Sequence, residues 1–212
     1  MRKRILRHLN QRSEMLSGIN HDLRTPLTRI KLQLAFIKDR DISNKLKNDV
    51  DEMEKMLNEY LQFTSSTHSE KNEIFNLSEL LNQAVDKYEN KNISKNLTQD
   101  IFINGRKNLL KRSFNNIIDN GLKYGKNINI ELNKSGKNIF IIIEDNGPGI
   151  PISEYENVFK PFYKIDKGRG DSKSSVGLGL SIASDIIRSH GGNIKLGKSS
   201  MKGLSVKIFL PL

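Results

Sequence analysis

Two apolar series with helical spacing fill the first third of the chain. The first recurs every seven residues, at Leu16, Leu23, Ile30 and Ile37, with Leu27 and Leu34 beside it. The second keeps steps of three and four residues, at Ile42, Leu46, Val50, Met53, Leu57 and Tyr60. This spacing predicts two amphipathic helices over residues 13–64, with DRDIS at 39–43 as the turn between them. Because each stripe is too long for one hairpin to bury, we expect two hairpins to pair in a four-helix bundle, which makes the protein a homodimer.

A different pattern follows the polar segment TSSTHSEKN at 64–72. Helical spacing at 76–90, 106–125 and 179–192 is mixed with strand-like runs at 100–104, 127–133, 138–145, 193–199 and 204–210. Asn76 and Glu79 have the spacing of a capping box, and Gly125 is expected to close the second helix. This order predicts an α+β layer with several helices on one face of a mixed sheet. The predicted organisation is a helical hairpin at 1–66, a linker at 67–73 and an α/β sandwich at 74–212.

Composition and charge narrow the function classes. The chain of 212 residues has no cysteine, which excludes disulfides, a thiolate nucleophile and cysteine metal sites. Its longest strictly apolar run, IFIII at 139–143, is far shorter than the ~20 residues of a membrane span. The net charge of +11 comes from both the first twelve residues and the second half of the chain. Such a surface could bind a nucleotide phosphate, an acidic protein or an anionic membrane, whereas the absence of an aromatic-rich basic stretch argues against specific nucleic-acid binding.

The stretch GINHDLRTPLTRIK at 18–31 carries the first candidate chemistry. On a helical wheel His21 lies about 140° and Thr25 about 180° from the centre of the apolar stripe, so both are expected to face solvent. Pro26 should bend the helix beside the histidine. The carboxylate of Asp22 can hold the imidazole in one tautomer and leave the other ring nitrogen free as a nucleophile. Taken alone, the pair is better explained as an ordinary surface histidine with an accidental proline nearby.

Further candidate chemistry follows in the second half. Asn116, Asn120 and Lys123 lie on one stripe of a predicted helix, where two amides and an ammonium could face a cation and phosphates. A polar helix edge explains this stripe at least as well. Asp145 ends an apolar strand and can accept a hydrogen bond from an exocyclic amine, while Gly147 and Gly149 permit close approach of a flat ring.

Two more short motifs follow along the chain. VFKPFYK at 158–164 supplies an aromatic pair that includes Phe162, a kind of pair more often found in a core than at a cofactor. SSVGLGL at 175–180 then runs Gly177, Leu178, Gly179 and Leu180 into the start of a helix, where free N–H groups favour phosphate. Each of these motifs is weak evidence by itself.

Together the motifs resemble a known family. HDLRTPLTRI matches, residue for residue, the phosphoacceptor box of the sensor histidine kinases of two-component systems, closest to the EnvZ osmosensor type. Four motifs resemble, in order, the N, G1, F and G2 boxes of the ATP-binding domain of these kinases: the asparagine stripe, DNGPGI, FKPF and GLGL. The fold of that domain is a Bergerat-type α/β sandwich. The resemblance covers the chain from about residue 13 to its end.

The resemblance implies roles for the candidate residues. His21 would be phosphorylated by the γ-phosphate of ATP, with Asp22 orienting the ring and taking its proton. Thr25 would act in dephosphorylating the partner protein, and Asn120, helped by Asn116, would hold Mg²⁺ across the phosphates. The residues implied to hold ATP are Asn116, Asn120, Lys123, Tyr124, Asp145, Gly147, Gly149, Phe162, Gly177, Leu178, Gly179 and Leu180. Residues 164–176 would form a mobile lid, whose path is in doubt because Ser175 stands where the G2 box commonly has its first glycine.

The resemblance also implies partners and a location. The phosphoryl group would pass to an aspartate of a response regulator of the OmpR type, and the hairpin would form a homodimer. Residues 1–12 resemble the tail of an upstream signalling linker, so we expect a soluble part on the cytoplasmic side of the inner membrane, reaching the membrane only through a missing N-terminal part. Three alternatives stay open at this point: an ATPase of the Hsp90, gyrase or MutL kind, a pseudokinase or phosphotransfer scaffold, and a nucleic-acid-binding protein.

Overall fold

The chain divides into two compact units, Met1–Ser69 and Glu70–Leu212. The structure, a computed structural model, describes residue 23 and residues 25–65, 70–88, 91–97, 100–165 and 176–212. Each unit is described by itself below. In the part of the chain that is described, no helix combines the length and the apolar character that crossing a membrane requires.

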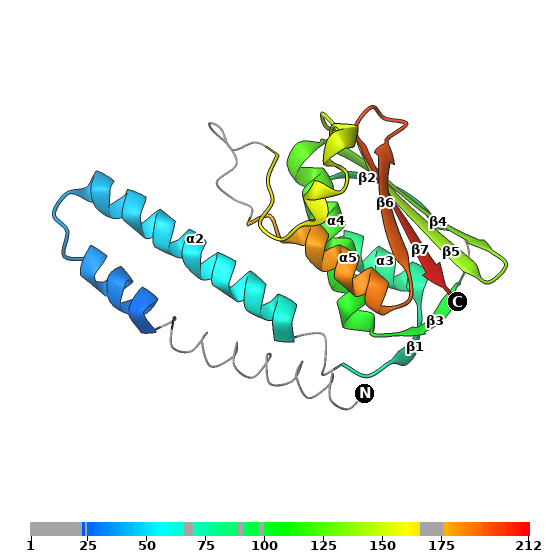
Figure 1. The fold of residues 1–212 in the computed structure, drawn as a ribbon, viewed down its shortest axis with the longest axis horizontal. Coiled ribbons are helices and arrows are strands. Elements are labelled where there is room, and N and C mark those ends of the chain that lie inside the picture. The colour runs from blue at the N-terminus through cyan, green and yellow to red at the C-terminus, as the bar shows by residue number, and fades with distance from the viewer. Residues whose placement is uncertain (1–22, 24, 66–69, 89–90, 98–99, 166–175) are drawn as a thin grey trace. The chain divides into compact units, whose positions relative to one another are not determined.

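The first unit is a helical hairpin. Residues 25–34 are helical, and α2 (Arg40–Ser65) returns beside them (Figure 1). Leu27, Leu34 and Val50 form a small buried core against which Leu57 packs. These residues belong to the two apolar series, so the predicted pairing of the helices is confirmed over the described residues.

The turn of the hairpin lies earlier than predicted. Helical residues end at 34 and α2 begins at Arg40, so the expected turn at 39–43 is wrong. The reason is a helix cap: Asp39 Oδ1 accepts the backbone N–H groups of Asp41 at 3.0 Å and of Ile42 at 3.1 Å. Ser43 Oγ also donates to Leu34 O at 2.8 Å and joins the two helix ends. Asp39 therefore starts the second helix rather than continuing the turn.

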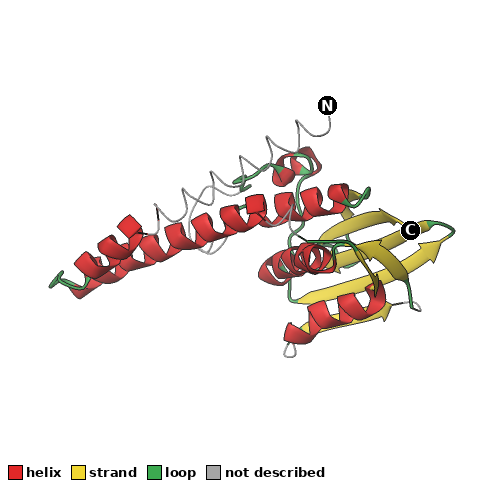
Figure 2. Cartoon of the chain, turned by 90° about the horizontal axis from the view of Figure 1, so that it is seen from below, coloured by secondary structure: helices red, strands yellow, loops and turns green. Residues whose placement is uncertain are grey.

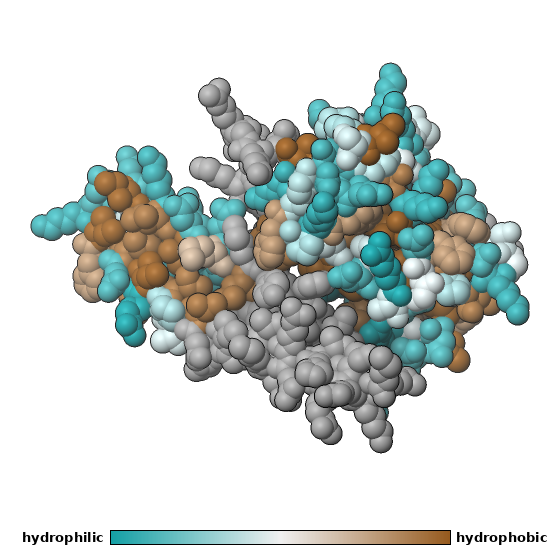
Figure 3. All heavy atoms as spheres, in the orientation of Figure 1, coloured by the Kyte–Doolittle hydropathy of each residue, from teal (hydrophilic) through white to brown (hydrophobic). Residues whose placement is uncertain are grey.

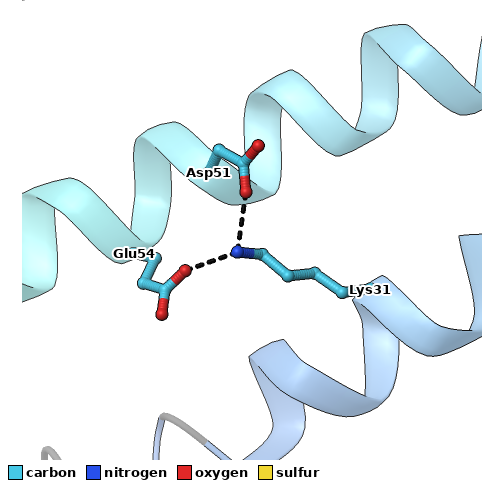
Figure 4. A network of polar contacts seen from close by, with 3 residues as sticks. All are labelled: Lys31, Asp51 and Glu54. Carbon is cyan, nitrogen blue, oxygen red and sulfur yellow. Dashed lines mark hydrogen bonds and ion pairs between the residues drawn. The ribbon is translucent and has the colours of Figure 1, made fainter.

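One ion-pair network links the two helices. Lys31 Nζ lies 2.7 Å from Asp51 Oδ1 and 2.5 Å from Glu54 Oε2 (Figure 4). The two carboxylates raise the pKa of Lys31, and the bond to Lys31 lowers the pKa of Asp51. Because the groups are partly exposed, the network contributes more to helix register than to stability.

Much of the apolar stripe remains uncovered in the single hairpin. Large apolar side chains of the two series are exposed, among them Leu23, Ile30, Ile37, Ile42, Leu46 and Met53. Figure 3 shows brown apolar atoms gathered on this part of the molecule. An exposed apolar surface of this kind marks an interaction face.

The second unit is a sheet with helices. Its elements are β1 (Glu73–Asn76), α3 (Leu77–Val85), η1 (Asp86–Tyr88), β2 (Asn92–Leu97), β3 (Phe102–Gly105), α4 (Lys107–Tyr124), β4 (Asn127–Ser135), β5 (Asn138–Asp145), η2 (Ile152–Glu154), η3 (Asn157–Phe159), α5 (Gly179–Ser189), β6 (Asn193–Lys198) and β7 (Leu204–Pro211). Five strands form a mixed sheet in the order β2-β4-β5-β7-β6, in which only β2 and β4 run parallel, and β1 pairs with β3 separately.

All three longer helices of this unit cover the same face of the sheet (Figure 2). Alternate residues of the central strands are buried beneath them: Ile128, Ile130, Leu132, Ile139, Ile141, Ile143, Val206, Ile208 and Leu210. The period of two in the burial pattern follows from the pleat of the strands. The predicted helix-on-sheet α/β sandwich is thereby confirmed.

Several element boundaries differ from the prediction. The helix expected at 76–90 becomes regular α3 only as far as Val85, and the helix expected at 179–192 ends at Ser189. Asn76 caps α3 by accepting the N–H groups of Ser78 and Glu79, but the Glu79 carboxylate accepts from Gln83. The strands β1 and β2 were not predicted, because β1 is only four residues long and β2, NISKNL, is a polar edge strand.

His190 joins the start of α4 to the end of α5. Its Nε2 accepts the N–H of Arg106 at 3.0 Å, while its Nδ1 lies 2.7 Å from Ile186 O and must carry the proton. Burial lowers the pKa of His190, with a further lowering from Arg106, against opposing effects of the Ile186 carbonyl and Glu70. The folded unit therefore holds this imidazole neutral.

We expect a pH-dependent stability from this histidine. Because its pKa is lower in the folded state than in the unfolded chain, its contribution is complete above about pH 6.5 and is lost as the pH falls through the folded pKa. His190→Gln can still accept from Arg106 but does not titrate. The difference in unfolding free energy between parent and variant, measured by urea titration, should shrink from pH 7 to pH 5. A difference that stays constant over this range would show that the imidazole keeps its ordinary pKa.

Candidate functional site

Helix α4 carries the first group of candidate residues. Its buried side includes Leu110, Phe114 and Ile117, as the apolar stripe predicts. Asn116 and Asn120 lie on the partly exposed flank. The Asn116 Nδ2 atom is buried without a hydrogen-bond partner among the described residues. An unpartnered amide at this position suits a bound polar group, because a buried donor left unpaired costs free energy.

The end of α4 adds a cation and an aromatic ring. The Lys123 ammonium lies 5.1 Å from the centre of the Tyr124 ring, and that ring is exposed. Positive charge near the C-terminus of a helix is favourable. Both residues therefore lie where the sequence predicts them, at the end of the asparagine stripe.

Asp145 is a buried carboxylate at the end of β5. Its Oδ1 accepts the N–H of Gly147 at 2.8 Å and the N–H of Leu204 at 3.2 Å, and 6% of the residue is exposed. Within the described residues, both of these bonds use the same oxygen. The second oxygen is therefore placed to accept a hydrogen bond from an amine.

Glycines around Asp145 allow a close backbone packing that a side chain would prevent. A Cβ atom on Gly147 would lie 2.8 Å from Tyr124 O and 2.9 Å from Asp145 Oδ1, and one on Gly203 would overlap Asp145. Gly149 has φ +72°, a backbone conformation that favours glycine. The G1 loop is thus packed directly against the end of α4.

Asn146 locks the same loop to the start of β4. Its Oδ1 accepts the N–H groups of Lys126 at 2.8 Å and Asn127 at 2.9 Å. Sequence reasoning did not single out Asn146, Gly203 or Leu204. The position of Gly203 directly before the last strand could have drawn attention to it. Asn146 and Leu204 act through contacts that only the fold creates.

The glycine pair at the start of α5 lies on the other side of the candidate site. Gly177 has φ +79°, and its carbonyl accepts the N–H of Phe162 at 3.0 Å. Phe162 itself has φ +64°, and its ring is exposed. Leu178 is buried and Leu180 partly buried. The backbone bond holds Phe162 against Gly177, just before α5.

Helix α4 brings these segments together. A Cβ on Gly179 would lie 3.8 Å from Asn116 O, whereas one on Gly121 would lie 3.6 Å from Asp145 Cβ. The positions of α4 that contact Gly179 and Asp145 therefore lie five residues apart, about 7.5 Å along the helix axis. Asn120 lies on the helix between the two.

The F-box segment has its own polar network. Tyr163 Oη donates to Glu154 Oε2 at 2.5 Å, and Asn157 Nδ2 donates to the same oxygen at 3.2 Å. These bonds lower the pKa of Glu154, and the bond to Glu154 raises the pKa of Tyr163. The network holds η2 and η3 next to Phe162.

The donor set suits a nucleotide with a divalent cation. No group of three or more His, Asp or Glu side chains in the described ranges could hold a metal ion. The amide oxygens of Asn116 and Asn120 are hard neutral ligands, and Mg²⁺ at phosphates takes few protein ligands. Gly147 further fixes the Asp145 carboxylate, because its N–H donates to Asp145 Oδ1 and a side chain at this position would collide with Tyr124 O.

A shallow depression elsewhere does not coincide with this site. It is lined by Ser78, Asn82, Leu97 and Asp100 and has a volume of about 490 Å³. Leu97 pairs with Leu132, whereas Asp145 pairs with Ile128 at the opposite end of β4. The depression therefore lies at the other end of the sheet.

Part of the candidate chemistry lies outside the described residues. His21, Asp22, Ser175 and the stretch 166–175 of the expected lid belong to this part. Thr25 is exposed, as the helical wheel predicts. The bend at Pro26 stays a prediction, because most of the helix before it is not described.

Comparisons with known proteins identify both units. Residues 11–69 match the model of the His Kinase A (phospho-acceptor) domain, and residues 105–212 match that of the histidine kinase-, DNA gyrase B- and HSP90-like ATPases. The whole chain is 33% identical to the sensor histidine kinase GtrS of Pseudomonas aeruginosa, of which it covers 44%. Over 97% of its length it is 30% identical to the sensor histidine kinase CpxA of Escherichia coli, of which it covers 48%. The chain thus spans less than half the length of these relatives.

Solved structures show the same fold. The full-length kinase ShkA in complex with AMPPNP superposes with a TM-score of 0.72 over 93% of this chain and 45% of that chain, at 18% identity. The mycobacterial sensor histidine kinase MprB gives 0.59 over 66% of this chain and 97% of that chain, at 23% identity. With a phosphoacceptor-domain match followed by an ATPase-domain match, this chain belongs to the sensor histidine kinases of two-component systems.

Proposed function

We propose that the protein phosphorylates itself on His21 with ATP and passes the phosphoryl group to an aspartate of a response regulator. The observation that carries this proposal is the arrangement along α4, where Asp145 lies beside Gly121 and Gly179 beside Asn116. In this proposal α4 carries the two amides for a cation, and it lies beside both the acceptor for a ring amine at the end of β5 and the glycines for phosphates at the start of α5. The phosphoacceptor box in the same chain supplies the nucleophile.

In the proposed reaction, a ring nitrogen of His21 attacks the γ-phosphorus of ATP. A P–N bond forms, the bond from the γ-phosphorus to the bridging oxygen breaks, and ADP leaves. Asp22 takes the imidazole proton. Asn120 and Asn116 would hold Mg²⁺, which would neutralise phosphate charge, and Lys123 adds a positive charge at the C-terminal end of α4. Asp145 and Gly147 orient the adenine.

The second step transfers the phosphoryl group from His21 to a carboxylate of the regulator. The P–N bond breaks, a P–O bond to the aspartate forms and the imidazole recovers a proton. A regulator of the OmpR type is our specific proposal, based on the similarity of the phosphoacceptor box to the EnvZ type.

The hairpin is proposed to work as a dimer. Its exposed apolar stripe, which includes Ile30, Ile42 and Met53, would be buried by a complementary apolar surface. A second copy of the hairpin provides one by symmetry and completes a four-helix bundle.

The experiment that tests the function uses ATP labelled at the γ-phosphate and an OmpR-type regulator. We expect label on the chain that is stable in base and labile in acid, followed by its appearance on the regulator. An ATPase of the gyrase or HSP90 kind would instead release free phosphate without labelling the chain. A scaffold without kinase activity would do neither.

Thr25 is proposed to act in removing the phosphoryl group from the regulator. It is exposed on the helix one turn after His21 in the sequence. We expect Thr25→Ala to slow dephosphorylation of the regulator about tenfold or more, in the range for loss of one hydrogen-bonding group in a catalytic step, while self-phosphorylation stays within about twofold. The rates are measured with purified phosphorylated regulator, and Thr28→Ala, which changes another exposed threonine, is the matched control. Unchanged dephosphorylation would remove Thr25 from this role.

A further inference from the structure

The first residue of the ATP-binding unit caps helix α4 from a distance. Glu70 Oε1 accepts the N–H of Asn108 at 2.7 Å and its Nδ2 at 3.0 Å, while Oε2 accepts the N–H of Leu109 at 3.1 Å. Asn108 and Leu109 occupy the second and third positions of α4, whose N–H groups have no partner within the helix. One carboxylate thus satisfies two free N–H groups at the positive end of the helix dipole.

Helix α4 depends on this external carboxylate because it lacks a local cap. Its N-cap residue, Arg106, makes no side-chain capping bond. The Arg106 guanidinium instead donates to Ser189 O at 3.2 Å and Ser189 Oγ at 2.6 Å, and its N–H donates to His190. The start of α4 is therefore held on one side by Glu70, which lies in the connector between the two units, and on the other side by the end of α5.

Glu70 also determines where the connector between the two units becomes fixed. Helix α2 ends at Ser65, so four residues separate it from Glu70. Without the bonds of Glu70, the first fixed residue would be Glu73, which pairs with Gly105 in the β1–β3 ladder, and seven residues would separate it from α2. The polar sequence around Glu70 had predicted only a linker.

We propose that Glu70 is a positioning residue that fastens the connector to α4, so that the ATP-binding unit stays within reach of His21 during phosphoryl transfer. The consequence for transfer rests on the proposed function. Asn108 precedes Asn116 by eight residues, about 12 Å along the helix, so Glu70 has no direct contact with the proposed nucleotide site. Loss of Glu70 should therefore affect the rate of transfer and leave ATP affinity within about twofold.

The test compares three variants of the whole chain: Glu70→Ala, Arg106→Ser and the double variant. Serine at position 106 supplies a local cap to α4 but cannot hold the connector. Trypsin cleavage after Lys71, an exposed residue next to Glu70, reports how firmly the connector is docked. Melting temperature, the ATP dissociation constant and the self-phosphorylation rate at saturating ATP are measured in parallel.

We expect Glu70→Ala to be cleaved after Lys71 about tenfold faster than the parent, from the loss of bonds to a charged group. Its self-phosphorylation rate should fall about twofold, because a longer connector lowers the effective concentration of the ATP site near His21. In the double variant the melting temperature should return to that of Arg106→Ser alone, while fast cleavage and slow transfer persist.

Two results would overturn the inference. Cleavage of Glu70→Ala at the parental rate would show that the connector is not held by this residue. Recovery of both protection and transfer rate in the double variant would show that Glu70 only caps the helix. Absence of phosphohistidine in the parent, with the difference in cleavage intact, would overturn the proposed function while supporting the docking of the connector by Glu70.

Discussion

Asp145→Asn is expected to weaken ATP binding about a hundredfold, with little change in the fold. The two backbone bonds of Asp145, from Gly147 and Leu204, end on one oxygen that asparagine retains. The second oxygen becomes an NH₂ group. An amine on the adenine ring would then face another donor instead of a charged acceptor, in a buried position where an unpaired polar group is costly.

Isothermal titration with ATP and Mg²⁺ measures this change. Asp100→Asn is the matched control, because Asp100 accepts from Asn76 at the opposite end of the sheet. The control should bind ATP like the parent, and thermal unfolding should show that Asp145→Asn remains folded. An ATP affinity within about threefold of the parent would exclude Asp145 as the acceptor of the ring amine.

Asn120→Ala is expected to lower the rate of self-phosphorylation about a hundredfold or more. The change removes an amide proposed to hold Mg²⁺ across the phosphates, and charge neutralisation there is needed most in the transition state. The effect should therefore be larger on the rate at saturating ATP than on ATP affinity.

A quenched-flow measurement with labelled ATP separates the two quantities. Asn133→Ala, which changes an exposed asparagine on β4, is the control and should behave like the parent. If Asn120→Ala kept the parental rate at saturating ATP, the cation would have to be held by other groups.

The central elements of the fold were predictable because each has a strong local pattern. The alternation in β4 and β5 defines the buried face, and the apolar stripe of Leu110, Phe114 and Ile117 orients α4. The turn of the hairpin was placed too late, since Asp39 can end a turn or cap a helix and only the packing of the two helices decides between these roles. The polar edge strand β2 gave no apolar signal.

The candidate site was predictable only where one motif carries the chemistry. Asp145 and Gly177 belong to such motifs, and the structure places them in a buried strand end and in a left-handed backbone position. Leu204 contributes to the site, and Glu70 to the start of α4, through bonds between segments that are 59 and 38 residues apart in the sequence. No local sequence pattern predicts a bond of this kind, so these two contributions could be found only from the folded structure.

The most direct test of the proposed function is self-phosphorylation of the whole chain compared with His21→Ala, with γ-labelled ATP and Mg²⁺. We expect acid-labile, base-stable label on the parent and none on His21→Ala, while both proteins bind ATP with the same affinity. Label that persists on His21→Ala, or a parent that releases phosphate without becoming labelled, would contradict it.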